Sequence, residues 1–181
     1  MTNADEFEAF VRRYQDLVFA TATRLLGSRV EAEDVAQVVF LKAFQRFDEI
    51  GPSPAAPGWL RTVTRNACLN HLSRHRARWR LFSEMGRRES DGSETAYEAT
   101  LVSKGSPDLD MEKADQHERL EQALLSLPDH QRVPLVLFHF ENADYREIAN
   151  ALGVSVAKIK TDMHRGRAAL RLHLTDHHGS R

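Results

Sequence analysis

The sequence predicts an all-α protein in which a flexible linker joins two small helical domains. Apolar residues recur at steps of three and four in both halves of the 181-residue chain, which is the spacing of amphipathic helices. Serine, glycine and proline gather between these periodic segments, where turns are expected. Residues 83–117 contain five serines and few large apolar residues, so this segment has too little apolar surface to fold alone.

The N-terminal domain is predicted to contain three helices. The first extends from about Asp5 to Leu26, and Gly27 follows at a position where a left-handed residue often closes a helix. Ser28 and Glu31 form an S-x-x-E capping box, which opens the second helix. The apolar face predicted for that helix is made of Val35, Val39, Phe40, Ala43, Phe44 and Phe47.

Residues 48–58 hold three prolines and two glycines and are predicted to form a loop. Pro57 suits the first turn of the third helix, which carries Trp59 and is expected to end near Arg80. The 35 residues of segment 83–117 are interpreted as the linker. Fully extended, they would span roughly 115 to 125 Å at ~3.3 to 3.6 Å each, so the two domains are expected to move independently.

The C-terminal domain is predicted to start where helical spacing returns, at about His117. A break at Pro128 precedes a further helix that carries Leu135, Leu137, Phe138 and Phe140. Pro134 lies in this helix and is tolerable only near the beginning or at a kink, because proline lacks the backbone N–H.

The stretch from Asp144 to Arg167 predicts a helix-turn-helix. Asp144 and Glu147 form a D-x-x-E cap for a short helix, Gly153 permits a tight turn, and Ser155 caps a basic second helix. In this motif the second helix enters the DNA major groove. A plain αα-hairpin with a solvated basic face is the alternative interpretation.

The outward face of the second helix carries polar residues suited to base edges or phosphates. These are Lys158, Lys160, Thr161, His164 and Arg165, with Arg167 and Arg171 farther along for phosphate. Asp162 is an acid among them. It either accepts a hydrogen bond from a cytosine amino group or has no part in DNA binding.

The charge pattern predicts two separate surfaces for phosphate. The chain has a net charge of −1, but residues 61–80 hold six arginines and no acid, and residues 155–173 carry a net charge of +4. Residues 81–117 and 1–50 are acidic, with net charges of −5 and −3. Such alternation suits a protein that binds nucleic acid and also a basic protein partner, although exposed helices also carry charge for solubility.

Other classes of protein find little support. The first twenty residues contain Asp5, Glu6 and Glu8 and resemble no signal peptide, and no apolar run approaches the ~20 residues of a membrane span. Cys68 is the one cysteine, so no internal disulfide forms and the cytoplasm is expected. Motifs for an enzyme, a cofactor or a metal site are lacking, so a non-enzyme without cofactor or metal is predicted.

Two long stretches resemble a known family. The stretch from Leu120 to Leu172, which contains DYREIANALGVSVAKIKTDMHRGR, is similar to region four of extracytoplasmic-function (ECF) sigma factors. EAEDVAQVVFLKAF, at residues 31–44, resembles the polymerase-binding helix of region two. WLRTVTRNACLNHLSRHR, at residues 59–76, resembles the helix that recognises the minus-ten promoter element. The order of these blocks and the polar spacer between them also agree with the family.

The resemblance implies a domain organisation and a set of partners. It implies region two at residues 1–82, the linker at 83–117, region four at 118–174 and a tail at 175–181. It implies a sigma factor that binds the clamp helices and flap of core RNA polymerase and then promoter DNA, with an anti-sigma factor as a further partner and no insertion into a membrane.

The resemblance also implies residue roles. Core polymerase would be bound by Glu33, Asp34, Gln37 and Phe40. The minus-ten element would be bound by Asn66 and Asn70, whose amides suit exposed base edges, together with Arg61, Arg65 and Arg74. The minus-thirty-five element would be bound by Ser155, Lys158, Lys160, Thr161, Asp162, His164, Arg165 and Arg167.

Three positions depart from the family pattern. Val38 stands where the family commonly has an acid after the Gln of the clamp motif, and Asp162 stands where a basic residue is frequent. The loop at residues 50–58 reads IGPSPAAPG and is richer in proline than the promoter-reading loop of the family. The rival prediction is a conventional helix-turn-helix regulator that binds duplex DNA as a dimer. A purely protein-binding decoy is a third possibility, but it would leave both basic patches without a role.

Overall fold

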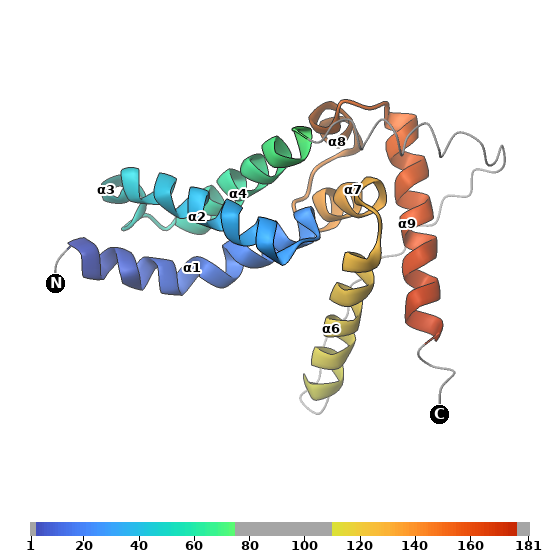
Figure 1. The fold of residues 1–181 in the computed structure, drawn as a ribbon, viewed down its shortest axis with the longest axis horizontal. Coiled ribbons are helices and arrows are strands. Elements are labelled where there is room, and N and C mark those ends of the chain that lie inside the picture. Colours follow the sequence, from blue (N-terminus) through green and yellow to red (C-terminus); the bar gives the residue numbers. More distant parts are fainter. Residues whose placement is uncertain (1–2, 75–109, 177–181) are drawn as a thin grey trace.

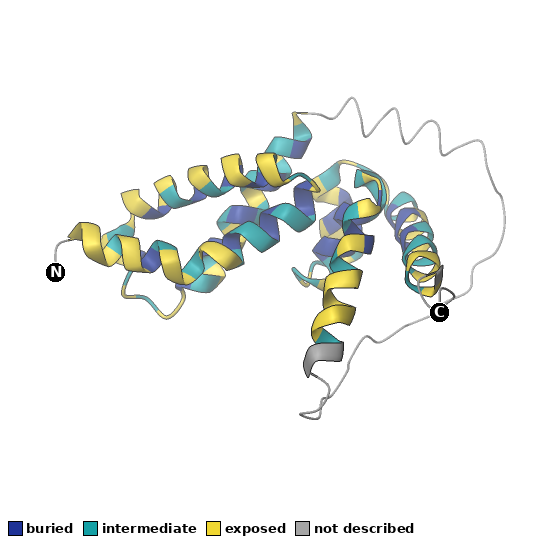
Figure 2. Cartoon of the chain, turned by 60° about the horizontal axis from the view of Figure 1, so that its bottom comes forward, coloured by how far each residue is buried: buried dark blue, intermediate teal, exposed yellow. Residues whose placement is uncertain are grey.

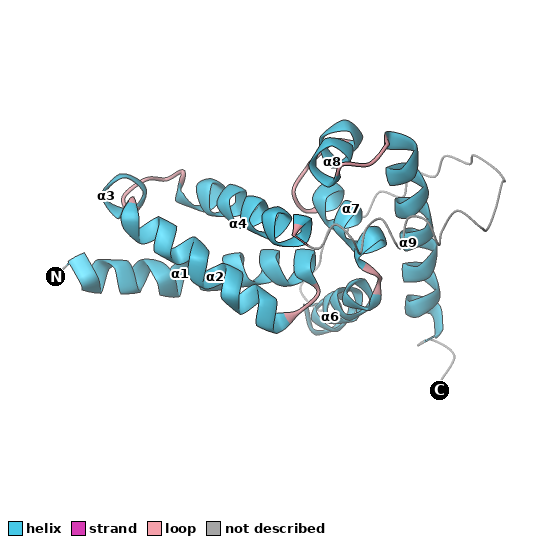
Figure 3. Ribbon diagram, turned by 45° about the horizontal axis from the view of Figure 1, so that its top comes forward, coloured by secondary structure: helices cyan, strands magenta, loops and turns pink. Residues whose placement is uncertain are grey.

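The computed structural model describes residues 3–74 and 110–176, and within these residues all regular secondary structure is helical (Figure 1, Figure 3). This confirms the all-α prediction. The helices are α1 (Asn3–Leu26), α2 (Arg29–Gln45), α3 (Phe47–Ile50), α4 (Ala56–Ser73), α6 (Asp110–Ser126), α7 (Asp129–His139), α8 (Tyr145–Leu152) and α9 (Val156–Asp176).

Helices α1, α2 and α4 pack against one another as the N-terminal domain (Figure 1). Their shared core contains Val18, Leu25, Val39 and Leu60, each at most 1% exposed. The predicted capping box is half formed, because the Ser28 hydroxyl accepts a hydrogen bond from the Glu31 N–H at 3.3 Å. The Glu31 carboxylate lies 3.5 Å from Nε2 of His71 and so joins α2 to α4.

The N-terminal domain differs from the prediction in two places. Residues 47–50 form the one-turn helix α3, so the loop is shorter than the predicted 48–58. The side chain of Phe44, predicted to face the core, is 56% exposed and only touches α1, with its ring 5.0 Å from that of Phe7. Pro57 lies in the first turn of α4, as predicted, and α4 ends at Ser73. The expected continuation to Arg80 falls outside the described residues.

Helices α6 to α9 form the C-terminal domain. The predicted capping box of α8 is complete: the Glu147 N–H donates to Asp144 Oδ1 at 2.9 Å, and the Asp144 N–H donates to Glu147 Oε2 at 2.8 Å. Gly153 ends the helix with a φ of 67°, the left-handed conformation that glycine adopts easily. Pro134 is buried in the interior of α7, beyond the first turn in which proline is best tolerated.

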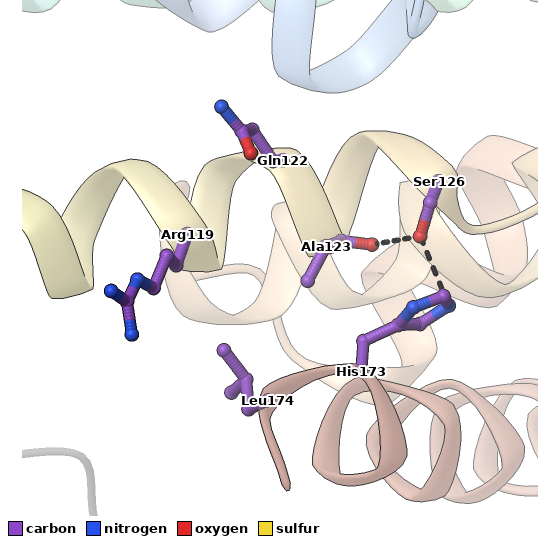
Figure 4. A pocket seen from close by; sticks show the side chains of 6 residues that line it. All are labelled: Arg119, Gln122, Ala123, Ser126, His173 and Leu174. Carbon is purple, nitrogen blue, oxygen red and sulfur yellow. Dashed lines mark hydrogen bonds between the residues drawn. The ribbon is translucent and has the colours of Figure 1, made fainter. Parts of the chain in front are cut away.

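Helix α9 closes the domain against α6 and α7. Ile159 and Met163 are fully buried, as the sequence predicts. Gly166 allows close approach, since a Cβ there would lie 2.7 Å from Leu135 Cδ1. At the far end, Ser126 of α6 lies 3.2 Å from Nε2 of His173 in α9, beside a shallow pocket of about 180 Å³ (Figure 4).

The two domains are in contact, with the end of α1 against α6 and α7. Buried residues, coloured dark blue in Figure 2, lie inside each domain and also around the place where the two domains meet. This contact is one arrangement of the two domains, and their independent movement stays a prediction. The linker is shorter than the predicted segment 83–117, because α6 begins at Asp110, inside that segment. Residues 83–109 lie outside the described residues.

Candidate nucleic-acid and protein interfaces

The helix-turn-helix presents one open polar face on α9. Lys160, Thr161 and His164 are exposed, and His164 lies four residues after Lys160 and three after Thr161, so the three share one side of the helix. Ser155 is also exposed, and its hydroxyl accepts a hydrogen bond from the Lys158 N–H at 3.2 Å, which caps the helix. The Lys160 ammonium lies 5.9 Å from the centre of the Tyr145 ring on α8.

Of the other predicted cations of α9, Arg171 is exposed, whereas three are half-buried: Lys158, Arg165 and Arg167. Nζ of Lys158 lies 2.7 Å from Oδ2 of Asp162. The Arg167 guanidinium lies 5.8 Å from the centre of the Phe138 ring and 3.4 Å from Nε2 of His139. The three half-buried side chains lie at the margin of the open face rather than at its centre.

Asp162 does not face solvent, so its predicted place on the DNA-binding face is wrong. Asp162 is 2% exposed, and its carboxylate is paired with Lys158 inside the domain. Its position explains this burial, because Asp162 lies three residues after Ile159 and next to Met163, both fully buried. A carboxylate held there has no access to a base edge, so the proposed hydrogen bond to cytosine is wrong for this structure.

His130 of α7 belongs to the same buried polar cluster. Burial lowers the pKa of its imidazole, the positive charges of Lys158 and Arg165 act in the same direction, and the charges of Asp162 and Asp129 oppose them. The imidazole is therefore neutral at physiological pH.

On α4, Asn66 and Asn70 are exposed and lie one turn apart, as the sequence predicts. Arg61 and Arg74 are exposed, whereas Arg65 is half-buried. At 3.6 residues per turn, the arginine pair Arg61 and Arg65 lies roughly 140° around the helix from the asparagine pair. The structure therefore separates the predicted minus-ten residues into two flanks.

The charges of the arginine flank of α4 act on an acid of the C-terminal domain. Burial raises the pKa of the Glu141 carboxyl, and the positive charges of Arg61, Arg65 and Arg24 oppose this rise. Glu141 follows α7, so this electrostatic effect acts between the two domains. The sequence gives no signal of it, because 76 positions separate Arg65 from Glu141.

On α2, Glu33, Asp34 and Gln37 are exposed, and Phe40 is half-buried against the core. Large exposed apolar side chains surround the polar residues: Val30, Val38, Leu41 and Phe44 are 69%, 47%, 64% and 56% exposed. Phe44 was predicted to face the core, and no role in an interface was predicted for the other three. With Asp34 and Gln37 they recur at steps of three and four, so they form one surface, here called the α2 face. The sequence signal for this face was Val38, an apolar residue at a position where the family commonly has an acid.

Within the described residues, no helix is long and apolar enough to cross a bilayer, and no three His, Cys, Asp or Glu side chains gather as a metal site.

Comparison with known proteins agrees with this arrangement. A family model described as "Sigma-70 region 2" matches residues 10–78, and one described as "Sigma-70, region 4" matches residues 117–170. The "ECF RNA polymerase sigma factor SigW" of Bacillus subtilis (strain 168) is 28% identical over 95% of this chain and 90% of its own length. The "RNA polymerase sigma-E factor" of Streptomyces avermitilis is 30% identical over 92% of this chain and 83% of its own length.

A solved structure described as "Co-crystal structure of the sigma factor RpoE in complex with the anti-sigma factor NepR from Bartonella quintana" is 24% identical to this chain. The match covers 97% of this chain and 98% of the chain in that structure, with a TM-score of 0.47.

Proposed function

The chain belongs to the ECF group of sigma-70 family RNA polymerase sigma factors, and we propose that it binds core polymerase through the α2 face and promoter DNA through α4 and α9. The observation that carries this proposal is the order of the two family matches along the chain. The region-two match covers most of α1 to α4, and the region-four match covers most of α6 to α9. A dimeric helix-turn-helix regulator needs no region-two domain and is set aside.

The exposed side chains of the α2 face support docking on core polymerase. Isolated exposed apolar residues are ordinary, but Val38, Leu41 and Phe44 lie together on one helix beside Asp34 and Gln37. Such a mixture of apolar contacts with hydrogen-bonding groups is typical of the centre and rim of a protein interface. The face therefore suits a helical partner surface that carries basic side chains.

The two DNA roles differ in chemistry. Asn66 and Asn70 offer amides that both donate and accept, which suits unstacked bases of an opened strand. Lys160, Thr161 and His164 lie on the second helix of a helix-turn-helix, which suits duplex DNA. We propose the first group for the minus-ten element and the second for the minus-thirty-five element, with Arg165 and Arg167 as phosphate contacts at its margin.

Further assignments rest on membership of the family. We propose that the protein acts without catalysis of its own, in the cytoplasm, and that an anti-sigma factor regulates it. The predicted boundary of region four at residue 118 falls inside α6, so we propose that region four begins with that helix. The end of region two near residue 82 stays a proposal.

Mutation of the α2 face tests the docking role. Asp34→Arg and Leu41→Lys should each weaken binding of core polymerase at least tenfold, because the first repels basic side chains of the partner and the second places a charge within an apolar contact. Asp16→Arg makes the same charge change as Asp34→Arg at an exposed position of α1 and should bind as wild type. Affinity is measured by fluorescence anisotropy with labelled protein, and circular dichroism reports folding. Equal binding by all three variants would refute docking through α2.

A further inference from the structure

One cation of α9 is held away from the face that the proposed function assigns to duplex DNA. Nζ of Lys158 lies 2.7 Å from Oδ2 of Asp162, and the two side chains are 21% and 3% exposed. The two residues lie four positions apart on one helix, so they are neighbours on its surface. Lys160, by contrast, is exposed, and its ammonium lies 5.9 Å from the centre of the Tyr145 ring. Two lysines only two positions apart therefore differ in whether their charge is available to a ligand.

The carboxylate of Asp162 is fixed by its place on the helix. At about 100° per residue, Asp162 lies between the open face that contains Thr161 and the side that carries the fully buried Ile159 and Met163. Helix α7 packs against α9 and helps to enclose the buried side. An aspartate this deeply placed cannot follow a lysine out to a DNA backbone. The pair therefore forms only where the lysine folds back toward the protein.

A DNA phosphate is a poor competitor for Lys158 in this arrangement. To reach a phosphate, Nζ would have to leave the buried carboxylate of Asp162 without this cation. Breaking a buried pair by removing one partner is strongly unfavourable, whereas an ion pair that is exposed to water contributes little. The pair itself adds little stability, since the loss of water around both charges offsets their attraction. Its main consequence is electrostatic, because α9 presents one fewer positive charge to DNA.

We propose that Asp162 is a positioning residue that withholds Lys158 from the DNA backbone and so sets how strongly α9 binds duplex DNA and how steeply that binding depends on salt. The proposal rests on the proposed function, which assigns α9 to duplex DNA. Phosphate contacts carry no sequence information, so a helix that makes fewer of them depends more on its contacts with bases. Asp162 thereby favours specific over non-specific binding without touching DNA.

Removal of the Asp162 charge should release Lys158 to a phosphate. Binding of the whole chain to a short duplex oligonucleotide is measured by fluorescence anisotropy at several salt concentrations, and circular dichroism reports folding. Each neutralised phosphate adds about 0.9 to the slope of log affinity against log salt concentration, so Asp162→Asn should steepen that slope by about 0.9. Its affinity relative to wild type should then fall about 3.5-fold between about 50 and 200 mM salt. Lys160→Gln is the comparison, and it should make the slope shallower by about 0.9.

The double variant Lys158→Gln/Asp162→Asn separates release of the lysine from simple loss of a negative charge. It lacks the whole pair and has the same net charge as wild type. Its salt slope should equal that of wild type, because the cation that Asp162→Asn releases is absent. A double variant that keeps the steeper slope would show that repulsion by the carboxylate, and not the position of Lys158, controls binding. Equal slopes for Asp162→Asn and wild type would also overturn the proposal.

Lysine labelling tests the wild-type chain without any substitution, so no effect on folding enters. Acetic anhydride should modify Lys158 several-fold more slowly than Lys160, as measured by mass spectrometry. Bound duplex should protect Lys160 and leave the rate at Lys158 unchanged. Equal rates in the free chain, together with protection of both lysines by duplex, would mean that Lys158 is already available to DNA and would refute its withdrawal.

Run-off transcription by wild type with core polymerase separates failure of this proposal from failure of the proposed function. Promoter-specific transcripts together with an unchanged slope in Asp162→Asn would overturn the role of Asp162 alone. If wild type directs no transcription and Lys160→Gln has the slope of wild type, the assignment of α9 to duplex DNA is wrong, and the role of Asp162 falls with it.

Discussion

Gly27→Ala measures how strongly Arg132 is held between the domains, and Gly153→Ala is its matched control. The two glycines have nearly the same left-handed φ, 68° and 67°. Alanine should therefore lose about 1 to 2 kcal/mol at either position through backbone strain alone. Their surroundings differ, because a Cβ at Gly153 would have no heavy atom within 4 Å, whereas at Gly27 it would lie 2.5 Å from the guanidinium of Arg132.

The added cost at Gly27 follows from the bonds that Arg132 must give up. Moving the guanidinium away from Gly27 breaks the 3.1 Å hydrogen bond to the Arg24 carbonyl and the weaker 3.5 Å contact to Leu25. A hydrogen bond to a charged group contributes about 1.5 to 3 kcal/mol. Gly27→Ala should thus lose about 2.5 to 5 kcal/mol in total, against about 1 to 2 kcal/mol for Gly153→Ala.

Urea unfolding followed by circular dichroism provides the comparison. The midpoint for Gly27→Ala should lie clearly below that for Gly153→Ala, which in turn should lie slightly below wild type. Equal losses in the two variants would mean that the guanidinium moves aside freely and that Arg132 is not held rigidly at the end of α1.

Three further predictions concern buried groups. Asp162→Asn should leave the preferred base sequence of the minus-thirty-five duplex unchanged in a binding selection, because the carboxylate is buried beside Lys158. A changed preference would mean that Asp162 contacts DNA. Stability should be full above about pH 6.5 and fall below it, because burial lowers the pKa of His130 from 6.5, so the unfolded state binds more protons there. Thermal unfolding between pH 8 and 5 tests this, and His130→Asn should flatten the curve. Burial and the charge of Glu141 raise the pKa of the Cys68 thiol to about 12. A thiol reagent should therefore label the protein at pH 8 only on unfolding. Rapid labelling of the folded chain would contradict the burial of Cys68.

Local signals in the sequence predict most of the helices. The D-x-x-E cap at Asp144, Gly153 as a left-handed stop and Pro57 in a first turn all act within a few residues, so their effect is readable from neighbouring positions. Helix α3 was missed because residues 48–58 are rich in proline and glycine, yet Phe47 and Ile50 still pack one turn against the core.

The site was predictable where it depends on helical period and less so where it depends on contacts between distant segments. The exposure of Asn66, Asn70 and Lys160 follows from their spacing relative to core residues. The burial of Asp162 also follows from that spacing, but its charge suggested a surface position. Arg132 contacts two residues of α1 that precede it by 108 and 107 positions in the chain. No local pattern in the sequence encodes these contacts.

The central claim, that this chain directs RNA polymerase to promoters through two DNA-binding domains, is tested most directly by run-off transcription. Purified core polymerase is combined with the chain on a library of promoter fragments, and the transcribed sequences are recovered. The account predicts transcripts only when chain and core are both present, from templates enriched for one motif near minus ten and a second near minus thirty-five. Enrichment that disappears when Asn66→Ala is used would link the minus-ten motif to α4. Specific binding of duplex fragments by the chain alone, with no transcription added to that of core, would contradict the claim.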